Sequence, residues 1–168
     1  MATASGMTLD QFLAIPSFDE KRLELIDGEV WEKPMPAWDH GRIAIVIGAA
    51  LNSAEPRAMI PATGDFDEST PLPDVAFYRD SPPGKGEWMT RPPHVAIEIL
   101  SPGQSRREMR TKIALYAAFG VESVWIVDPE SELVEVYEGG SRRIVSGDET
   151  LASPSVPGFA MNLREIFA

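Results

Sequence analysis

The sequence contains no cysteine, and none of its apolar runs is long. The lack of cysteine excludes disulfides, thiolate chemistry, and zinc or iron–sulfur sites built on cysteine. The apolar runs fall well short of the roughly 18 residues that a membrane-spanning helix needs, and residues 1–5 do not lead from a basic region into an apolar one. We therefore expect a cytoplasmic protein that does not enter a membrane.

Positive charge is also scarce, since the formal net charge is −11 and the pI is about 4.6. Such a balance argues against a surface that binds nucleic acid over a large area, because phosphate binding normally needs a basic patch. A local patch is compatible with the sequence, because Arg106, Arg107, Arg110 and Lys112 form a basic island. A bound divalent metal would offset part of the carboxylate charge at a site.

The 168 residues, 43% of them apolar, fit one domain spanning 1–168. Capping boxes, an Asp-Gly turn and apolar periodicity predict an α/β fold with a mixed central β-sheet, flanking helices, and N-terminal and C-terminal β-hairpins. The expected helices start at Thr8, Asp39, Ser105 and Asn162; the expected strands cover 22–33 as a hairpin, 58–60 with Phe66, 73–78, 95–100, 124–127, and 133–145 as a second hairpin.

Two of the short apolar strands each carry one carboxylate. Asp74 lies in the run from Pro73 to Tyr78, and Glu98 lies in the run from Val95 to Leu100. An ionised side chain in an apolar strand is costly to desolvate unless a cation or hydrogen-bond donor compensates it, so the pair suggests a functional site. Lys112, on or beside the apolar face of the following helix, is the candidate third member.

The chemistry that suits this set is phosphodiester hydrolysis. That reaction needs a hard cation held by oxygen ligands, a polarised water and a positive group near the developing charge. The residues alone also allow purely structural interpretations. Asp74 could simply accept backbone hydrogen bonds, Glu98 and Lys112 could form a purely structural ion pair, and Lys112 alone would more often be a surface lysine.

Other polar and aromatic residues carry weaker signals. Arg106, Arg107 and Arg110 are read either as a solvated helix face or as possible phosphate contacts. His40 and His94 have no partner at ligand spacing and receive no metal role. In the long segment 79–93, Trp88 is the candidate for stacking on a base.

A series of motifs along nearly the whole chain resembles the Uma-type family of restriction endonucleases, in the PD-(D/E)XK nuclease superfamily. The motifs are Glu24-Leu-Ile-Asp-Gly-Glu29, Pro73-Asp74-Val75, Glu98-Ile-Leu-Ser-Pro102, Lys112 with Tyr116, Gly120-Val121, Val124-Trp-Ile-Val-Asp128-Pro129 and Pro157-Gly158-Phe159.

The resemblance implies a restriction-endonuclease-like core and DNA cleavage that depends on Mg²⁺ or Mn²⁺. It implies Asp74 and Glu98 as metal ligands, Lys112 as the residue that assists the attacking water, and Glu24 as an accessory acid. The superfamily pattern places the lysine two residues after the second acid, where this chain has Leu100. Lys112 matches a lysine that has moved to the following helix.

The sequence therefore predicts a metal-dependent endonuclease that acts on DNA, and a homodimer is compatible with this prediction. The alternative is a catalytically inactive nuclease-fold protein that serves as a dimeric binding or accessory subunit, which the acidic pI and the lack of a separate DNA-reading module favour. Glycoside hydrolysis by a carboxylate pair is a weaker third reading, because it does not require a lysine beside the acids.

Overall fold

The structure is a computed structural model that describes residues 6–16, 21–54, 58–59, 69–80, 82, 84 and 91–168. The expected strand positions Ile60 and Phe66, and the stacking candidate Trp88, lie outside these residues. The elements in chain order are α1 (Leu9–Leu13), β1 (Leu23–Ile26), β2 (Glu29–Glu32), α2 (Trp38–Ala54), β3 (Ala58–Met59), β4 (Val75–Phe77), β5 (Val95–Ile99), α3 (Arg106–Ala118), β6 (Ser123–Asp128), β7 (Leu133–Glu138), β8 (Ser141–Ser146), β9 (Thr150–Ala152), β10 (Ala160–Asn162) and α4 (Leu163–Phe167).

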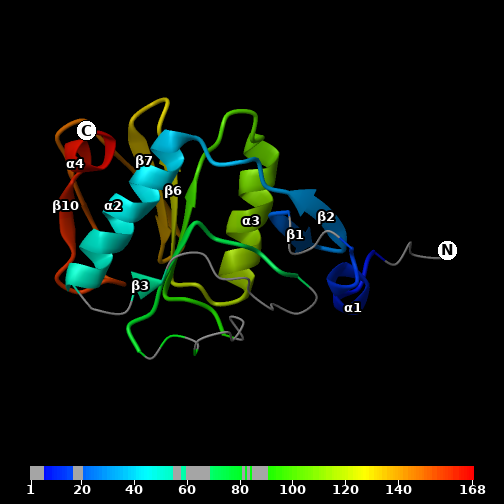
Figure 1. Cartoon of the computed structure of the whole chain (residues 1–168). Helices are drawn as coiled ribbons and strands as arrows, with labels where there is room; N and C mark the ends of the chain where they lie inside the picture. Colours follow the sequence, from blue (N-terminus) through cyan, green and yellow to red (C-terminus); the bar gives the residue numbers. More distant parts are fainter. Residues whose placement is uncertain are drawn as a thin grey trace.

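A six-stranded mixed sheet forms the centre, with the strands in the order β3-β4-β5-β6-β7-β8. Only β5 and β6 run parallel, and α3 is the crossover between them; the other neighbours pair antiparallel. A parallel pair requires such a crossover connection, whereas antiparallel neighbours can be joined by turns. The predicted α/β fold with a mixed sheet and flanking helices is confirmed (Figure 1).

The two faces of the sheet carry different cores. Because side chains alternate along a strand, Val95, Ile97 and Ile99 of β5 face α2 and α4, while Ala96 and Glu98 face α3. Figure 1 shows α2 and α4 on one side of the sheet and α3 on the other. The larger core lies on the α2 and α4 side, and the smaller core, beneath α3, includes Tyr116. Glu98 is therefore on the less apolar face of the sheet, under α3.

The N-terminal hairpin forms a separate two-stranded sheet of β1 and β2. Asp27 and Gly28 at its turn both have positive φ, 51° and 78°, as the favoured two-residue hairpin turn requires. The backbone N–H of Thr70 donates to the Leu25 carbonyl at 2.7 Å, and the Leu25 N–H donates to Thr70 Oγ1 at 2.9 Å. These bonds tie the hairpin to the segment that leads into β4.

Helix α3 begins at the predicted capping box, in which Ser105 Oγ accepts from the Glu108 N–H and the Glu108 side chain accepts from the Ser105 N–H. Met109 and Tyr116 lie on the buried face of this helix, whereas Gly120 is exposed. Gly120 ends the helix instead, with a φ of +84° that suits glycine.

The C-terminal region holds one arrangement that the sequence pattern did not predict. β7 and β8 form the expected hairpin and extend the central sheet, whereas β9 and β10 pair as a second small sheet. These strands are only three residues long, so alternation gives almost no signal for them. In the described part of the chain, every helix is too short or too polar to cross a bilayer.

Candidate active site

Asp74 and Glu98 lie side by side at the junction of β4 and β5. Val75 is paired with Ile97 in this antiparallel register, so the position before Val75 lies beside Glu98. Both acids are almost fully buried, with relative exposures of 2% and 1%. Two carboxylates at adjacent buried positions repel each other and lose hydration, so each must be compensated by donors or cations.

Asp74 is compensated on both oxygens. Oδ1 accepts from Lys33 Nζ at 2.9 Å and from Arg22 at 3.2 Å, and Oδ2 accepts from the Ile99 N–H at 2.8 Å and lies 3.1 Å from His40 Nε2. Burial favours the neutral acid, but the contact with His40 and the charge of Lys33 outweigh it and hold the pKa of Asp74 well below its usual value. Asp74 is therefore an ionised carboxylate at neutral pH.

Glu98 connects the sheet to α3. Its Oε1 accepts from the Tyr116 hydroxyl at 2.6 Å and lies 2.5 Å from Lys112 Nζ, while its Oε2 accepts from Lys33 Nζ at 3.0 Å. Burial and the nearby charge of Glu98 raise the pKa of Tyr116 well above its ordinary value, so this phenol remains a hydrogen-bond donor.

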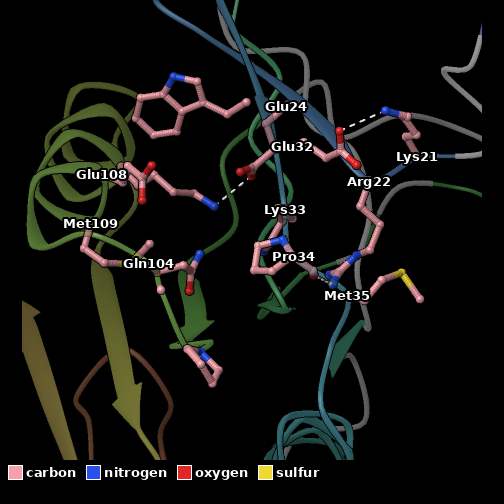
Figure 2. Close-up of a pocket in the computed structure, with 14 residues that line it drawn as sticks. Lys21, Arg22, Glu24, Glu32, Lys33, Pro34, Met35, Gln104, Glu108 and Met109 are labelled. Atoms are coloured by element: carbon pink, nitrogen blue, oxygen red, sulfur yellow. Dashed lines mark hydrogen bonds and ion pairs between the residues drawn. The ribbon is translucent and has the colours of Figure 1, made fainter.

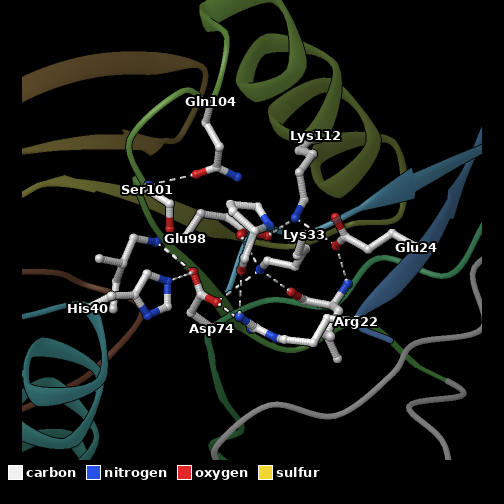
Figure 3. Close-up of polar contacts among 12 residues, drawn as sticks. Arg22, Glu24, Lys33, His40, Asp74, Glu98, Ser101, Gln104 and Lys112 are labelled. Carbon is white, nitrogen blue, oxygen red and sulfur yellow. Dashed lines mark hydrogen bonds and ion pairs between the residues drawn. The ribbon is translucent and has the colours of Figure 1, made fainter. Parts of the chain in front are cut away.

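Lys112 also reaches Glu24 of the hairpin, whose Oε1 accepts from Lys112 Nζ at 2.7 Å. The same oxygen accepts from the Leu72 N–H at 2.6 Å. Glu24 is therefore a buried carboxylate with hydrogen-bond partners from α3 and from the segment before β4. Figure 3 shows the four side chains predicted as catalytic pointing toward one another. Glu24 comes from β1, Asp74 from the position before β4, Glu98 from β5 and Lys112 from α3.

Sequence reasoning missed Lys33, which is central to the cluster. Its ammonium donates to Asp74, to Glu98 and to the Leu72 carbonyl, the last at 2.7 Å. Burial favours the neutral amine, but the charges of Glu98 and Asp74 outweigh it and raise the pKa of Lys33 above its usual value. A signal was available, because the hairpin register places Arg22, Glu24 and Lys33 on one face.

His40 is the second residue that sequence reasoning missed. It received no site role for lack of a partner at ligand spacing, yet its Nε2 contacts Asp74 Oδ2. Helical spacing from the core residues Ile43 and Ile47 puts His40 on the buried face of α2, directed at the sheet. His94 is distant from this set; its Nδ1 accepts from the Arg79 N–H at 3.2 Å.

A cleft of about 490 Å³ opens above the cluster, between the hairpin, the turn after β5 and α3 (Figure 2). The side chains of Glu24, Lys33 and Lys112 reach it. Among the described residues that line it, neither acid of the sheet is present, so Asp74 and Glu98 lie behind the two lysines. The remaining lining residues are Lys21, Arg22, Trp31, Glu32, Pro34, Met35, Pro102, Gly103, Gln104, Glu108 and Met109.

The three arginines expected as phosphate contacts are exposed on α3. Arg107 and Arg110 line a separate hollow with Asp27, and Arg106 is not among the described lining residues of either hollow. The cations that the structure places in the cleft are Lys21, Arg22, Lys33 and Lys112 instead. A basic run on a helix does not fix which side of the helix faces the cleft, and the turn of α3 directs Lys112 there.

The donor atoms fit a hard divalent cation. Asp74 Oδ1, Glu98 Oε2 and the Leu72 carbonyl converge on one point, and carboxylate and carbonyl oxygens are the ligands that Mg²⁺ and Mn²⁺ prefer. No group of three or more Asp, Glu or His side chains in the described ranges is arranged as a metal site. Two acids and one backbone oxygen would therefore supply the protein ligands, with water completing the shell.

Comparisons with known proteins assign the chain to a family and a fold. The model of the Uma2 family, described as "Putative restriction endonuclease", matches residues 9–164. The chain belongs to this family. A solved structure described as a "putative nuclease belonging to DUF820", from Anabaena variabilis ATCC 29413, is similar in fold, with a TM-score of 0.84 and 26% sequence identity. That match covers 96% of this chain and 97% of the other.

A search of curated proteins gave no match. Membership of the Uma2 family identifies the chain as one with a restriction-endonuclease-like fold, as the motif series predicted. It places the clustered acids and lysines on a nuclease scaffold, and it leaves their individual roles to the geometry described above.

Proposed function

We propose that the protein is a metal-dependent endonuclease that hydrolyses DNA phosphodiester bonds, with Asp74 and Glu98 as the metal ligands. The observation that carries the proposal is the pair of adjacent buried acids behind a cleft, with Lys112, which lines the cleft, bound to Glu98, in a member of a restriction-endonuclease family. A divalent cation such as Mg²⁺ or Mn²⁺, when bound, would polarise the attacking water and stabilise charge on the phosphorus.

The protein's own residues have separate tasks in this proposal. Lys112, held by Glu98 and Glu24 within 2.7 Å, orients the attacking water from the α3 side of the cleft. Glu24 holds the Lys112 amine in place and anchors the segment before β4 by accepting from the Leu72 N–H. Tyr116 fixes the Glu98 carboxylate through its hydroxyl. Each polar group is preorganised by a partner from another element, which limits reorganisation during the reaction.

The cleft supports a nucleic-acid substrate in an otherwise acidic protein. Lys21 and Arg22 stand at its rim and can meet phosphates, while Trp31 offers an aromatic ring to a base. Arg106, Arg107 and Arg110 would contact phosphates only if DNA wraps past the start of α3. DNA is therefore held by a local basic cleft, in keeping with the net charge of −11.

The test is nicking of supercoiled plasmid DNA in Mg²⁺ or Mn²⁺, with an RNA substrate in parallel. We expect Asp74→Asn and Glu98→Gln each to lower the rate by about 10²-fold to 10³-fold or more, because each removes a charged ligand from the metal. The matched control is Glu32→Gln, which alters an exposed carboxylate of the same cleft.

Circular dichroism should show that each variant keeps the wild-type fold. Unchanged nicking by Glu98→Gln would reject the mechanism. A wild-type protein that binds the metal and cuts neither nucleic acid would instead support the reading as an inactive accessory subunit.

We further propose that the whole chain, 1–168, is one domain, since both cores pack against the same sheet. A homodimer is also proposed. Its support is a set of large apolar side chains exposed before and along α2, namely Met35, Trp38 and Ile45. Sedimentation velocity of the wild type and of Trp38→Glu tests it.

A further inference from the structure

The ammonium of Lys33 fills the point on which the proposed metal ligands converge. Its three donor bonds go to Asp74 Oδ1, Glu98 Oε2 and the Leu72 carbonyl, at 2.9, 3.0 and 2.7 Å. These are the three oxygens that would ligate a divalent cation. An ammonium has three donors, so this position satisfies it completely.

Lys33 also lies between the acids and the solvent. It lines the cleft, whereas the side chains of Asp74 and Glu98 are 1% exposed and are not among the described lining residues. An ion that arrives through the cleft would meet the Lys33 amine before it reaches either acid. Figure 3 shows Lys33 between Asp74 and Glu98, directed at both.

The other oxygens of the two acids are already engaged. Asp74 Oδ2 accepts from the Ile99 N–H and contacts His40, while Glu98 Oε1 is held by Tyr116 and Lys112. Arg22 also donates to Asp74 Oδ1, at 3.2 Å, beside the position that Lys33 fills. An incoming cation therefore has one shared position to take. Two cations could not occupy it together, because repulsion between charges a few ångströms apart in a buried site is strong.

From this geometry we infer that Lys33 is a built-in competitor for the metal: its amine occupies the cation position, and metal binding requires that amine to leave for the cleft. The inference rests on the proposed assignment of Asp74 and Glu98 as metal ligands. It explains how two adjacent buried acids are stabilised when no metal is bound, and it makes metal affinity depend on the release of one side chain.

The first experiment measures Mn²⁺ affinity by isothermal titration calorimetry, without DNA. We expect Lys33→Met to bind Mn²⁺ at least about tenfold more tightly than the wild type, because the competing charge is gone. Lys112→Met is the matched comparison, since it removes an equal charge from Glu98 but leaves the shared position filled. Lys21→Met, which alters an exposed lysine of the same cleft, should leave the affinity unchanged.

Equal tightening in Lys33→Met and Lys112→Met would overturn the inference, because it would indicate a general charge effect. Weaker binding in Lys33→Met than in the wild type would also overturn it. The comparison is made only between variants whose circular dichroism shows a folded chain.

The second experiment uses the wild-type protein, so it does not depend on whether Lys33→Met folds. Lysine amines are modified by reductive methylation with and without saturating Mg²⁺, and the sites are read by mass spectrometry. We expect Lys33 to be protected without metal and to become reactive with it, while Lys112 stays protected in both states. Protection of Lys33 at saturating Mg²⁺ would show that the amine stays in place, and the inference would fail.

The two proposals can fail separately. If the wild type nicks DNA but Lys33 stays protected in Mg²⁺, the nuclease function stands and the competition is wrong. If Lys33→Met binds Mn²⁺ more tightly and Lys33 is released by Mg²⁺, yet the wild type cuts no nucleic acid, the competition stands and the nuclease function is wrong.

Discussion

At the scale of single residues, the buried charges of the site are compensated by other side chains of the same protein. The buried acids Glu24, Asp74 and Glu98 are matched by Lys33 and Lys112, with Arg22 and His40 at the margin. In the described part of the chain, every buried side-chain nitrogen or oxygen has a hydrogen-bond partner. Removing one member leaves an unpaired buried charge, which costs more than the pair contributes when intact.

The tyrosines give a residue-scale prediction about pH. The sequence has three, and burial is the main cause that raises the pKa of each. The pKa of Tyr78 is raised to about 12. The charge of Glu98 adds to the effect of burial at Tyr116, and the hydrogen bond to Glu135 adds to it at Tyr137. The folded state therefore holds phenolic protons that the unfolded state has lost above about pH 10. Stability should fall as pH rises through that point.

The measurement is a titration of phenolate absorbance in the near ultraviolet, followed in parallel by circular dichroism. We expect little phenolate signal near pH 10 and a rise that accompanies loss of structure at higher pH. Tyr78→Phe should remove part of this base sensitivity. Ionisation of all three phenols near pH 10 in a protein that remains folded would contradict the burial described here.

At the scale of elements, the β1–β2 hairpin brings Arg22 and Lys33 to the acids of the sheet. The same face of the hairpin directs Glu24 toward Lys112, and the Lys33 N–H donates to the Arg22 carbonyl at 2.8 Å. The hairpin is itself positioned by its contact with the segment before α1. Any change that tilts the hairpin should therefore disturb both the cleft and the acids behind it.

Gly28→Ala tests this dependence. Gly28 has a φ of +78°, and a Cβ there would lie 2.7 Å from the Cα of Gly6, so both backbone strain and overlap oppose the substitution. We expect a loss of about 2–4 kcal/mol in the free energy of unfolding, measured by urea denaturation, together with reduced nicking activity.

Gly147→Ala is the control for the effect of backbone conformation alone. Gly147 has a φ of +61°, and no atom lies within 4 Å of its would-be Cβ, so the expected loss is only about 1 kcal/mol. Equal losses in the two variants would show that the contact between Gly6 and Gly28 does not hold the hairpin.

At the scale of the whole molecule, the chain is acidic, with a net charge of −11, and its cleft is lined by both lysine or arginine and glutamate side chains. In the proposed function, the net charge would keep DNA away from most of the surface, and Lys21 and Arg22 would attract it at the cleft. The most exposed large apolar side chains of the described residues lie before and along α2, where Met35 is 85%, Trp38 84% and Ile45 64% exposed, and Met35 also lines the cleft. Such exposure is costly in water and is typical of an interface.

Sedimentation velocity over a range of protein concentrations tests the proposed homodimer. We expect the wild type to sediment as a dimer and Trp38→Glu to sediment as a monomer, because a charge at the centre of an apolar interface is desolvated without a partner. Leu13→Glu, at an exposed apolar side chain of α1, is the control and should remain dimeric. A wild type that is monomeric at every concentration would reject the dimer.

The sequence by itself determined the local structure. The Asp27-Gly28 turn, the capping boxes at Thr8 and Ser105, and the alternation in β5 are set by residues close along the chain, and the structure has them all. The presence of Asp74 and Glu98 in apolar strands also indicates a candidate site from the sequence alone, because the cost of burying a charge depends little on the details of the fold.

Only the tertiary structure decided that Lys33 and His40 also contact these acids. Lys33 contacts Asp74, which is 41 residues away in the sequence, and Glu98, which is 65 residues away. His40 contacts Asp74 from α2, which lies on the face of the sheet opposite α3. Local patterns place a side chain on a face, but the docking of that face onto another element is set by packing of the whole core. The partner of a buried charge is therefore fixed by the packed fold, which brings together atoms that the sequence keeps far apart.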